Sequence, residues 1–343
     1  MKATIKSIAK ACNMSTTSVS LVLNGKPNRI SEASRALILE TAARMHYSPN
    51  QLAVGLVKGR SRTIGLILSD ISNIFLSEIA KTIEEEAKKL DFTIILGNTG
   101  DIGSRALAYI REFISKNVDG IIYLHASQTT PEEENEFREV ISKVDIPFVM
   151  LDNDLADMEK IQRCILDNEK GGYMATEHLL KLGHRKIGSL LGPLGQCSVR
   201  NRLAGHKKAL AQWKIPFEKR LVFNGDFTLE SGMKAMPYFM DQGVTAIFSY
   251  NDMMAYGLYL YARQHGIVIG KDVSVIGFDD IFVDELLEVP LTTIKQPRTV
   301  IAKKAIELLL SMIKDKKEAG EPVVYQPELI LRKSTSKLSE TSK

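Results

Sequence analysis

Between Tyr47 and Arg62 the chain has the sequence Tyr-Ser-Pro-Asn-Gln-Leu-Ala-Val-Gly-Leu-Val-Lys-Gly-Arg-Ser-Arg, which separates two unlike parts. Before this stretch the chain is short, basic and patterned for helices. After it, apolar strands alternate with amphipathic helices. At 343 residues the chain is also too long for one compact domain. We therefore predict a helical domain in residues 1–47, a hinge helix and linker in 48–62, and a larger α/β domain in 63–332.

Positive charge is concentrated at the start of the chain. Residues 1–62 contain ten Lys and Arg side chains and two Glu side chains, a formal charge of +8, whereas the remainder has a charge of −4. A solvated surface mixes both signs, so this asymmetry indicates contact with a polyanion. Charge alone does not distinguish DNA from RNA or an anionic membrane.

The sequence contains no targeting or membrane signal. No apolar run approaches the roughly 18 residues of a membrane span, and the first residues lack the apolar core of a signal peptide. We expect a cytoplasmic protein with no membrane partner. Cys12, Cys164 and Cys197 are odd in number and far apart, which predicts reduced packing residues rather than disulfides or a zinc site.

The first 46 residues carry the capping and apolar signals of three helices. We expect helices over 5–11, 16–23 and 31–46, with Thr4, Ser15 and Ser31 at their N-termini and Gly25 ending the second in a left-handed conformation. Two short helices around a tight turn predict a helix-turn-helix. The expected packing residues are Val19, Val22 and Leu23 in the second helix, and Ala33, Leu37, Ala42 or Ala43, and Met45 in the third.

The outward face of the second helix carries Thr16, Thr17, Ser20 and Leu21. Short hydroxyls and an apolar side chain near a helix N-terminus can contact base edges and thymine methyls in the major groove, and the helix N-terminus favours a phosphate. The alternative is that these side chains only solvate a small helical domain. Together with the charge of +8, the pattern favours DNA binding.

This part of the chain resembles the N-terminal headpiece of the LacI family of bacterial transcription regulators. The matching motifs are Thr4-Ile5-x-x-Ile8-Ala9, the run from Met14 to Gly25, Ile30-Ser31 and Tyr47-Ser48-Pro49-Asn50. The resemblance implies that Thr16, Thr17 and Leu21 contact bases and that Ser15, Ser20, Asn24 and Arg29 contact phosphates, with Thr4 also at the DNA. Many members have a polar or basic residue where Leu21 stands, so we expect an apolar base contact there.

From Thr63 onward, near-continuous apolar strands separated by helices predict parallel sheets covered on both faces, which is a doubly wound α/β fold. About ten such units exceed one sheet, and a break near Arg163 divides them into two similar halves. In this fold a ligand lies at the carboxyl ends of the strands. The loops expected there contain carboxylates, amides, an arginine and aromatic rings, which suit a neutral polyhydroxylated ligand. For any single residue, capping of the following helix is the competing role.

The resemblance to the LacI family continues through this half, in motifs such as Asp167-Asn168-x-x-Gly171-Gly172, Arg202-x-x-Gly205, Asn251-Asp252-x-x-Ala255 and Val273-Ser-Val-Ile-Gly-Phe-Asp-Asp280. It implies a periplasmic-binding-protein-like core of two subdomains, residues 63–163 with 295–323 and residues 164–294 with 324–332. It also implies an effector, and the residues it places in the effector site are Asn73, Phe75, Asp152, Arg202, Phe227, Asn251 and Asp279. Asn251-Asp252 resembles the sugar-binding members, and the identity of the sugar stays open.

No enzyme signature competes with this interpretation. Gly97-x-x-Gly100-x-x-Gly103 is not a dinucleotide pattern, there is no Walker-type or Gly-x-Ser-x-Gly motif, and the six histidines lack metal-ligand spacing. We expect no catalytic residue, no metal and no cofactor. The remaining alternative is the solute-binding protein of a sugar transporter, which would have the α/β core but no basic headpiece.

The resemblance further implies a repressor of a double-stranded DNA operator. One helix-turn-helix per chain contacts too few phosphates for tight specific binding, which predicts a homodimer on a pseudo-palindromic operator. The Ser-, Thr- and Lys-rich composition of residues 333–343 predicts a disordered tail. In the hinge, residues 50–58 can form a short helix with Leu52, Ala53 and Leu56 on a shared face. The resemblance implies that Asn50, Ala53 and Leu56 contact the DNA and that Leu56 inserts into the minor groove. The alternative is that Leu56 only packs within the linker. Gly55 weakens this helix by about 1 kcal/mol relative to Ala, so we expect it to fold only on the operator. Whether the effector releases DNA or promotes binding does not follow from the sequence.

Overall fold

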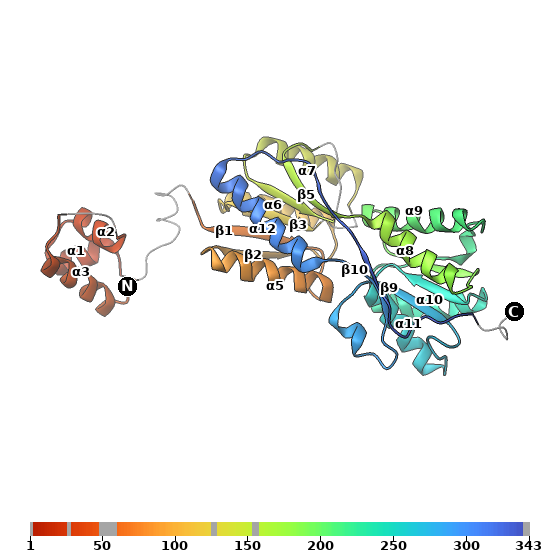
Figure 1. The fold of residues 1–343 in the computed structure, drawn as a ribbon. Coiled ribbons are helices and arrows are strands. Elements are labelled where there is room, and N and C mark those ends of the chain that lie inside the picture. Colours follow the sequence, from red (N-terminus) through yellow and green to blue (C-terminus); the bar gives the residue numbers. More distant parts are fainter. Residues whose placement is uncertain (1–2, 26–28, 48–59, 125–128, 153–157, 339–343) are drawn as a thin grey trace. The chain divides into compact units, whose positions relative to one another are not determined.

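The computed structural model describes residues 3–25, 29–47, 60–124, 129–152 and 158–338. It divides into two compact units, Met1–Ser61 and Arg62–Lys343, which are treated separately below (Figure 1). Within the described residues, no helix is long and apolar enough to cross a membrane. The predicted hinge residues Asn50, Ala53, Gly55 and Leu56 lie outside the described part of the chain.

The N-terminal unit is a bundle of three helices, α1 (Ile5–Cys12), α2 (Thr16–Leu23) and α3 (Glu32–Arg44). Each begins at a hydroxyl cap, because the side chains of Thr4, Ser15 and Ser31 accept the backbone N–H three residues later. Gly25 follows α2 with φ +62°, the left-handed conformation expected of it. The helix-turn-helix is therefore confirmed.

The core of this unit corrects the predicted face of α3. Ile38 is fully buried together with Ile8 and Val19, whereas Leu37 is 45% exposed. Burial at Ile38, Thr41 and Ala42 follows the i, i+3, i+4 spacing of one helical face. The prediction is confirmed at Ala42 and Met45 and wrong at Ala33 and Leu37, because α3 carries Leu37, Ile38 and Leu39 in succession and its apolar pattern does not single out one of them.

The larger unit contains two six-stranded sheets. The first has the strand order β11-β5-β4-β3-β1-β2, and all its neighbouring strands are parallel. Its strands are β1 (Thr63–Leu68), β2 (Thr93–Asn98), β3 (Gly120–Leu124), β4 (Phe148–Leu151), β5 (Ile161–Leu166) and β11 (Val323–Tyr325). Its helices are α5 (Ile74–Lys89), α6 (Gly103–Ser115), α7 (Pro131–Lys143) and α12 (Arg298–Asp315).

Helices cover both faces of this first sheet (Figure 1). Along β1, the buried Ile64, Leu66 and Leu68 share one cluster with the apolar faces of α5 and α12, while Ile67 joins a second cluster with α6 and α7. Successive strand residues point to opposite faces, so a strand that is apolar throughout needs a helical layer on each side. The doubly wound fold predicted from the sequence is confirmed here.

The second sheet has the strand order β12-β10-β9-β8-β6-β7 and is parallel except for β12, which runs antiparallel to β10. Its strands are β6 (Ile187–Leu191), β7 (Val222–Asn224), β8 (Ala246–Ser249), β9 (Ser274–Asp279), β10 (Thr292–Lys295) and β12 (Glu328–Ile330). Its helices are α8 (Asn168–Lys181), α9 (Cys197–Gln212), α10 (Leu229–Asp241) and α11 (Asp252–Gln264), with short 3-10 turns η1 (Lys219–Leu221) and η2 (Phe282–Glu285).

The chain passes between the two sheets three times, at positions that differ slightly from the expected subdomain boundaries. The boundary expected after residue 163 falls within β5, which remains in the first sheet to Leu166. The boundary expected after 294 precedes the last residue of β10, and the one expected after 323 falls within β11. A strand belongs to its sheet up to the last residue that pairs with the neighbouring strand. The neighbouring strand therefore determines where each boundary lies.

The prediction of a disordered tail from residue 333 is wrong for residues 333–338. Ser334 is fully buried, donates to Val275 O at 2.6 Å and accepts the N–H of Thr292 at 2.8 Å. Leu338 N donates to Leu182 O at 2.9 Å. The Ser, Thr and Lys composition suggests disorder, but these short hydroxyl side chains satisfy backbone groups of the second sheet.

Candidate functional site

The predicted base-contacting side chains share one face of the N-terminal unit. Thr16 and Thr17 are exposed, and Ser20 and Leu21 are partly exposed. With Ile5 and Lys6 of α1 they line a single hollow. The buried Val19 and Val22 point the other way, which fixes the direction of this face. A helix that presents hydroxyls and one apolar side chain beside a lysine has the chemistry for base and phosphate contacts.

The other predicted DNA contacts have structural bonds of their own. Thr4 Oγ1 accepts Ser7 N at 3.1 Å, and Ser15 Oγ accepts Ser18 N at 3.0 Å, so both cap helices. Asn24 Nδ2 donates to Ser20 O at 2.8 Å, which closes the end of α2. These residues lie at helix ends, where backbone groups and caps can also meet phosphates. Arg29 is exposed.

In the larger unit, three polar side chains join the two sheets. Asp152, which follows β4, accepts a hydrogen bond from Asn168 Nδ2 at 3.1 Å. Arg202 on α9 donates from Nε to Asn168 Oδ1 at 2.8 Å, and its Nη1 donates to the carbonyl oxygen of Tyr250 after β8. The amide of Asn168 thus links a carboxylate of the first sheet to a guanidinium of the second.

A close approach of two helices places Arg202. A Cβ added to Gly172 of α8 would lie 2.1 Å from Arg202 O, and one added to Gly205 of α9 would lie 1.9 Å from Glu169 O. Both positions therefore require glycine. The guanidinium carbon of Arg202 then lies 3.6 Å from the centroid of the Phe278 ring.

Burial shifts the pKa values of Arg202, Asp152 and Asp279. It lowers the pKa of Arg202, which the negative charges of Asp152 and Asp279 oppose. It raises the pKa of Asp152, while the charge of Arg202 and the hydrogen bond from Asn168 lower it. Burial and the charge of Asp252 raise the pKa of Asp279 well above its ordinary value. A carboxyl with a raised pKa can donate as well as accept hydrogen bonds, as ligand hydroxyls require.

The other predicted effector contacts form two further groups. Asn251 caps α11, since its Oδ1 accepts Met254 N at 2.9 Å, and its Nδ2 donates to Phe227 O at 3.1 Å. The Phe227 ring packs so closely on residue 192 that an added Cβ would lie 2.3 Å from it, which requires Gly192. These bonds fix the loop that carries Phe227 and use part of the Asn251 amide.

Asn73 and Phe75 form the third group, at the N-terminus of α5. Asn73 Oδ1 accepts Phe75 N at 3.0 Å and caps the helix. The Phe75 ring is 7% exposed and belongs to the core cluster of the first sheet. Its expected role as a ring contact for the effector therefore remains untested, and its observed role is in packing.

The fold adds several residues to the site that were not among its predicted members. Asn168 is 4% exposed and Gln296 is 2% exposed, and Gln296 Nε2 donates to Asp279 Oδ1 at 2.7 Å. Both lie within two residues of a strand end, which is the signal that could have identified them. Asp252, named above only as part of a family motif, has no exposed surface and accepts the backbone N–H of Asp280 at 2.8 Å.

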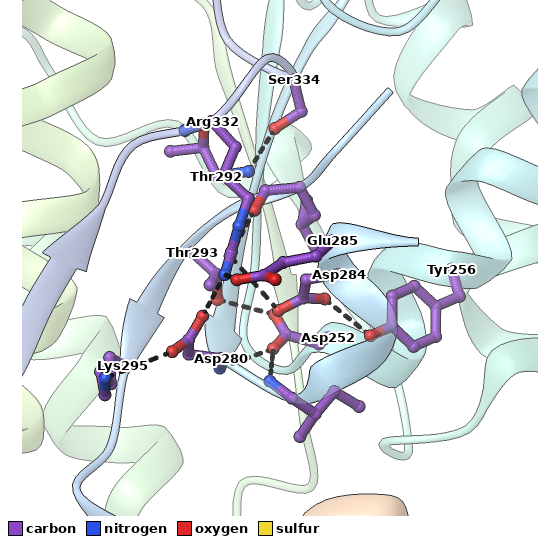
Figure 2. A network of polar contacts seen from close by, with 12 residues as sticks. Asp252, Tyr256, Asp280, Asp284, Glu285, Thr292, Thr293, Lys295, Arg332 and Ser334 are labelled. Carbon is purple, nitrogen blue, oxygen red and sulfur yellow. Dashed lines mark hydrogen bonds and ion pairs between the residues drawn. The ribbon is translucent and has the colours of Figure 1, made fainter. Parts of the chain in front are cut away.

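Asp252 belongs to the polar network of Figure 2. Its second carboxylate oxygen accepts Thr293 Oγ1 at 2.7 Å. Arg332 donates to Asp280 Oδ1 at 2.7 Å and lies 3.8 Å from Asp284, whose other oxygen accepts the Tyr256 hydroxyl at 2.6 Å. The network connects the end of β9, the start of α11, strand β10 and the segment after β12.

Comparisons with known proteins agree with both units. Residues 4–50 match the family described as bacterial regulatory proteins, lacI family, and residues 176–335 match the periplasmic binding protein-like domain. The chain is 34% identical over 340 residues to the transcriptional repressor PurR of Vibrio parahaemolyticus, covering 98% of this chain and 100% of that protein. The match over residues 4–50 favours a regulator over a solute-binding protein.

Solved structures show the same architecture. A lac repressor dimer bound to operator and the anti-inducer ONPF is 26% identical, with a TM-score of 0.84 over 98% of this chain and 100% of that one. A LacI-family regulator from Enterococcus faecium with bound ribose is 30% identical, with a TM-score of 0.72 over 81% of this chain and 100% of that one. The protein belongs to the lacI family of bacterial regulatory proteins, as the headpiece motifs predicted.

Proposed function

We propose that the protein is a homodimeric repressor that binds a pseudo-palindromic operator and is controlled by a small-molecule effector at the junction of the two sheets. The contact of Asp152, Asn168 and Arg202 carries this proposal, because it joins the two sheets through polar groups, of which Asn168 and Arg202 are buried. A molecule that bonds to this group interacts with both sheets at once. It can therefore change their equilibrium arrangement if it binds one arrangement better.

The chemistry of the junction favours a neutral sugar. Arg202 is 3% exposed, and its Nε and Nη1 donate to the Asn168 side chain and to the carbonyl oxygen of Tyr250. Two carboxyls with raised pKa values, Asp152 and Asp279, interact with the same guanidinium. Hydrogen-bond donors and acceptors that lie close together suit vicinal hydroxyls, which both donate and accept. The bound ribose of the Enterococcus faecium regulator agrees with this ligand class.

The small size of the N-terminal unit favours a dimer with two DNA-contacting units. A single small helical domain covers too few phosphates and bases for tight specific binding, and a dimer presents two of them to the two half-sites. The lac repressor of known structure binds its operator as a dimer. Because chromosomal DNA is the proposed target, the protein would act in the cytoplasm and without catalysis.

A thermal-shift screen of the full-length protein against sugars, sugar phosphates and nucleobases tests the ligand class. We expect neutral sugars, with D-ribose as the first probe, to raise the unfolding midpoint and to change affinity for an operator selected from random duplexes. Asp152→Asn should remove the shift, whereas the exposed Asp145→Asn should preserve it. Stabilisation by nucleobases alone would contradict the sugar proposal, and a monomer that protects a single half-site would contradict the dimer.

A further inference from the structure

The end of β9 turns through two consecutive residues with left-handed backbone. Asp279 has φ +134° and Asp280 has φ +60°, and neither is glycine. Such conformations cost about 1–3 kcal/mol each and persist only where surrounding contacts hold them. Asp279 is also a member of the proposed effector site. The contacts that hold this corner, defined here as Asp279 and Asp280, therefore determine where the Asp279 carboxyl lies.

The second sheet holds the corner from two sides, as Figure 2 shows. Asp252 Oδ2 accepts Asp280 N at 2.8 Å and Ile281 N at 3.4 Å. Arg332 Nη2 donates to Asp280 Oδ1 at 2.7 Å, and Lys295 Nζ lies 3.8 Å from Asp280 Oδ2. The backbone N–H and the side chain of Asp280 are thus both fixed by groups of its own subdomain.

The carbonyl group of Asp280 is held from the other subdomain. Arg298 is the first residue of α12, which packs on the first sheet, and its Nη1 donates to Asp280 O at 2.7 Å. The same guanidinium places its Nε 2.5 Å from Glu78 Oε2 on α5. One planar group therefore contacts the corner with one edge and α5 with another, a geometry that a lysine ammonium cannot reproduce.

Glu78 depends on this contact. Its Oε2 is buried, and no described residue forms a hydrogen bond to that oxygen. Arg298 supplies the charge beside it, with side-chain exposures of 20% for Arg298 and 28% for Glu78. A partly desolvated ion pair is strongly sensitive to the loss of one partner. A movement of the corner that displaced Arg298 would therefore also disturb α5.

We propose that Arg298 is a positioning residue that couples the corner carrying Asp279 to helix α5 of the first subdomain. Ligand contacts that shift Asp279 would change the hydrogen bond at Asp280 O, and the rigid guanidinium would transmit that change to Glu78. The consequence for operator binding rests on the proposed function. The coupling itself is a property of the free protein and is tested without any ligand.

Hydrogen–deuterium exchange of the full-length protein measures the coupling at both ends. We expect Arg298→Met to increase exchange of the Asp280 and Ile281 amides about tenfold, the change that loss of 1.4 kcal/mol produces. Glu78→Gln should increase exchange at the same two amides although residue 78 lies on α5. Arg298→Lys should give an intermediate increase. Lys303→Met is the matched control, because Lys303 joins α12 to Glu86 of α5 at 3.5 Å without contacting the corner.

The double variant Arg298→Met with Glu78→Gln separates coupling from simple charge balance. It removes the Glu78 carboxylate that Arg298→Met alone leaves without a partner cation, so the unfolding midpoint should return toward that of the wild type. Exchange at the corner should stay fast, because Asp280 O still lacks its donor. If Glu78→Gln affects only α5, or if the double variant restores slow exchange at the corner, Arg298 stabilises the fold and couples nothing.

Ligand and operator measurements then distinguish this inference from the proposed function. For a sugar that stabilises the wild type, Arg298→Lys should retain its affinity within about threefold while the sugar's effect on operator affinity falls about tenfold. An equal loss of sugar affinity and of the sugar's effect on operator affinity would place Arg298 in ligand binding and overturn the coupling. If no sugar binds, the proposed function fails, and the exchange data still decide the coupling.

Discussion

The guanidinium of Arg202 lies over the Phe278 ring, with 3.6 Å between the guanidinium carbon and the ring centroid. This stacking orients the fork of N–H groups toward Asn168 and the carbonyl of Tyr250. A planar cation is needed for this arrangement, because an ammonium group cannot lie as a plane over a ring while its donors point from fixed, widely separated positions. The position of Arg202 thus depends on a ring that belongs to the core of the second sheet.

Arg202→Lys should weaken binding of a stabilising sugar by tenfold or more, since the lysine loses the bond to Asn168 and the stacking on Phe278. Isothermal titration calorimetry measures the change. Arg200→Lys is the matched control on the same helix, because Arg200 bonds only to the carbonyls of Leu194 and Gly195 among the described residues. Equal affinity of Arg202→Lys and wild type would remove Arg202 from the site.

The carboxyl of Asp284 predicts a pH dependence of stability. Burial, and the negative charge of Asp252, raise the pKa of Asp284 to about 10. A carboxyl whose pKa is raised by folding stabilises the native state most at low pH, and this contribution decreases between its unfolded pKa near 4 and pH 10. The free energy of unfolding should therefore fall with rising pH, by at most about 1.4 kcal/mol per pH unit.

Asp284→Asn should flatten this dependence, because the amide imitates the protonated acid and can still bond to the Tyr256 hydroxyl. Urea unfolding between pH 5 and 9 measures it. Glu285→Gln serves as the control, since Glu285 contacts the same Arg332 but its side chain is 72% exposed. A slope that is unchanged in Asp284→Asn would show that another group binds the proton.

Gly205→Ala should separate α8 from α9, because the new Cβ would lie 1.9 Å from Glu169 O. Overpacking of this kind costs about 1–3 kcal/mol, and the loss should appear in urea unfolding. Binding of a stabilising sugar should weaken as well, since Asn168 and Arg202 lie on these two helices. Gly320→Ala is the control, where the nearest atom would be 3.7 Å away. Equal stability of the two variants would contradict the close packing.

Thr17→Val should weaken binding to a selected operator by about 1–3 kcal/mol and leave non-specific DNA binding unchanged, because it removes a hydroxyl from an exposed position without altering charge. Fluorescence anisotropy with the selected duplex and with a random duplex measures both affinities. A parallel loss on the two duplexes would assign Thr17 to the phosphates instead of the bases.

Gly55→Ala should raise operator affinity and weaken the control exerted by an effector. The reason is helix propensity, since Ala favours a helix by about 1 kcal/mol over Gly. Operator titration with and without a stabilising sugar measures both effects. Unchanged operator affinity would argue against a hinge helix that includes residue 55.

Much of the architecture could be predicted from local pattern. The caps at Thr4, Ser15 and Ser31 follow from side chains that bond within one helical turn, and the apolar strands followed by helices define a doubly wound fold. The face of α3 could be predicted only in part, with Ala42 right and Leu37 wrong, because three consecutive apolar residues fit more than one register. The order of residues 333–338 could not be predicted either, because it depends on strand-edge groups far away in the chain.

The sequence by itself determined the two-part organisation, the helix-turn-helix and the family, since these depend on residues close together in the chain. Only the tertiary structure decided which polar residues share a site. Asp152, Asn168 and Arg202 meet because two sheets bring their strand ends together, and Arg298 reaches both Asp280 and Glu78 because α12 returns to the first sheet. Contacts between residues so distant along the chain are set by packing, which local sequence patterns do not encode.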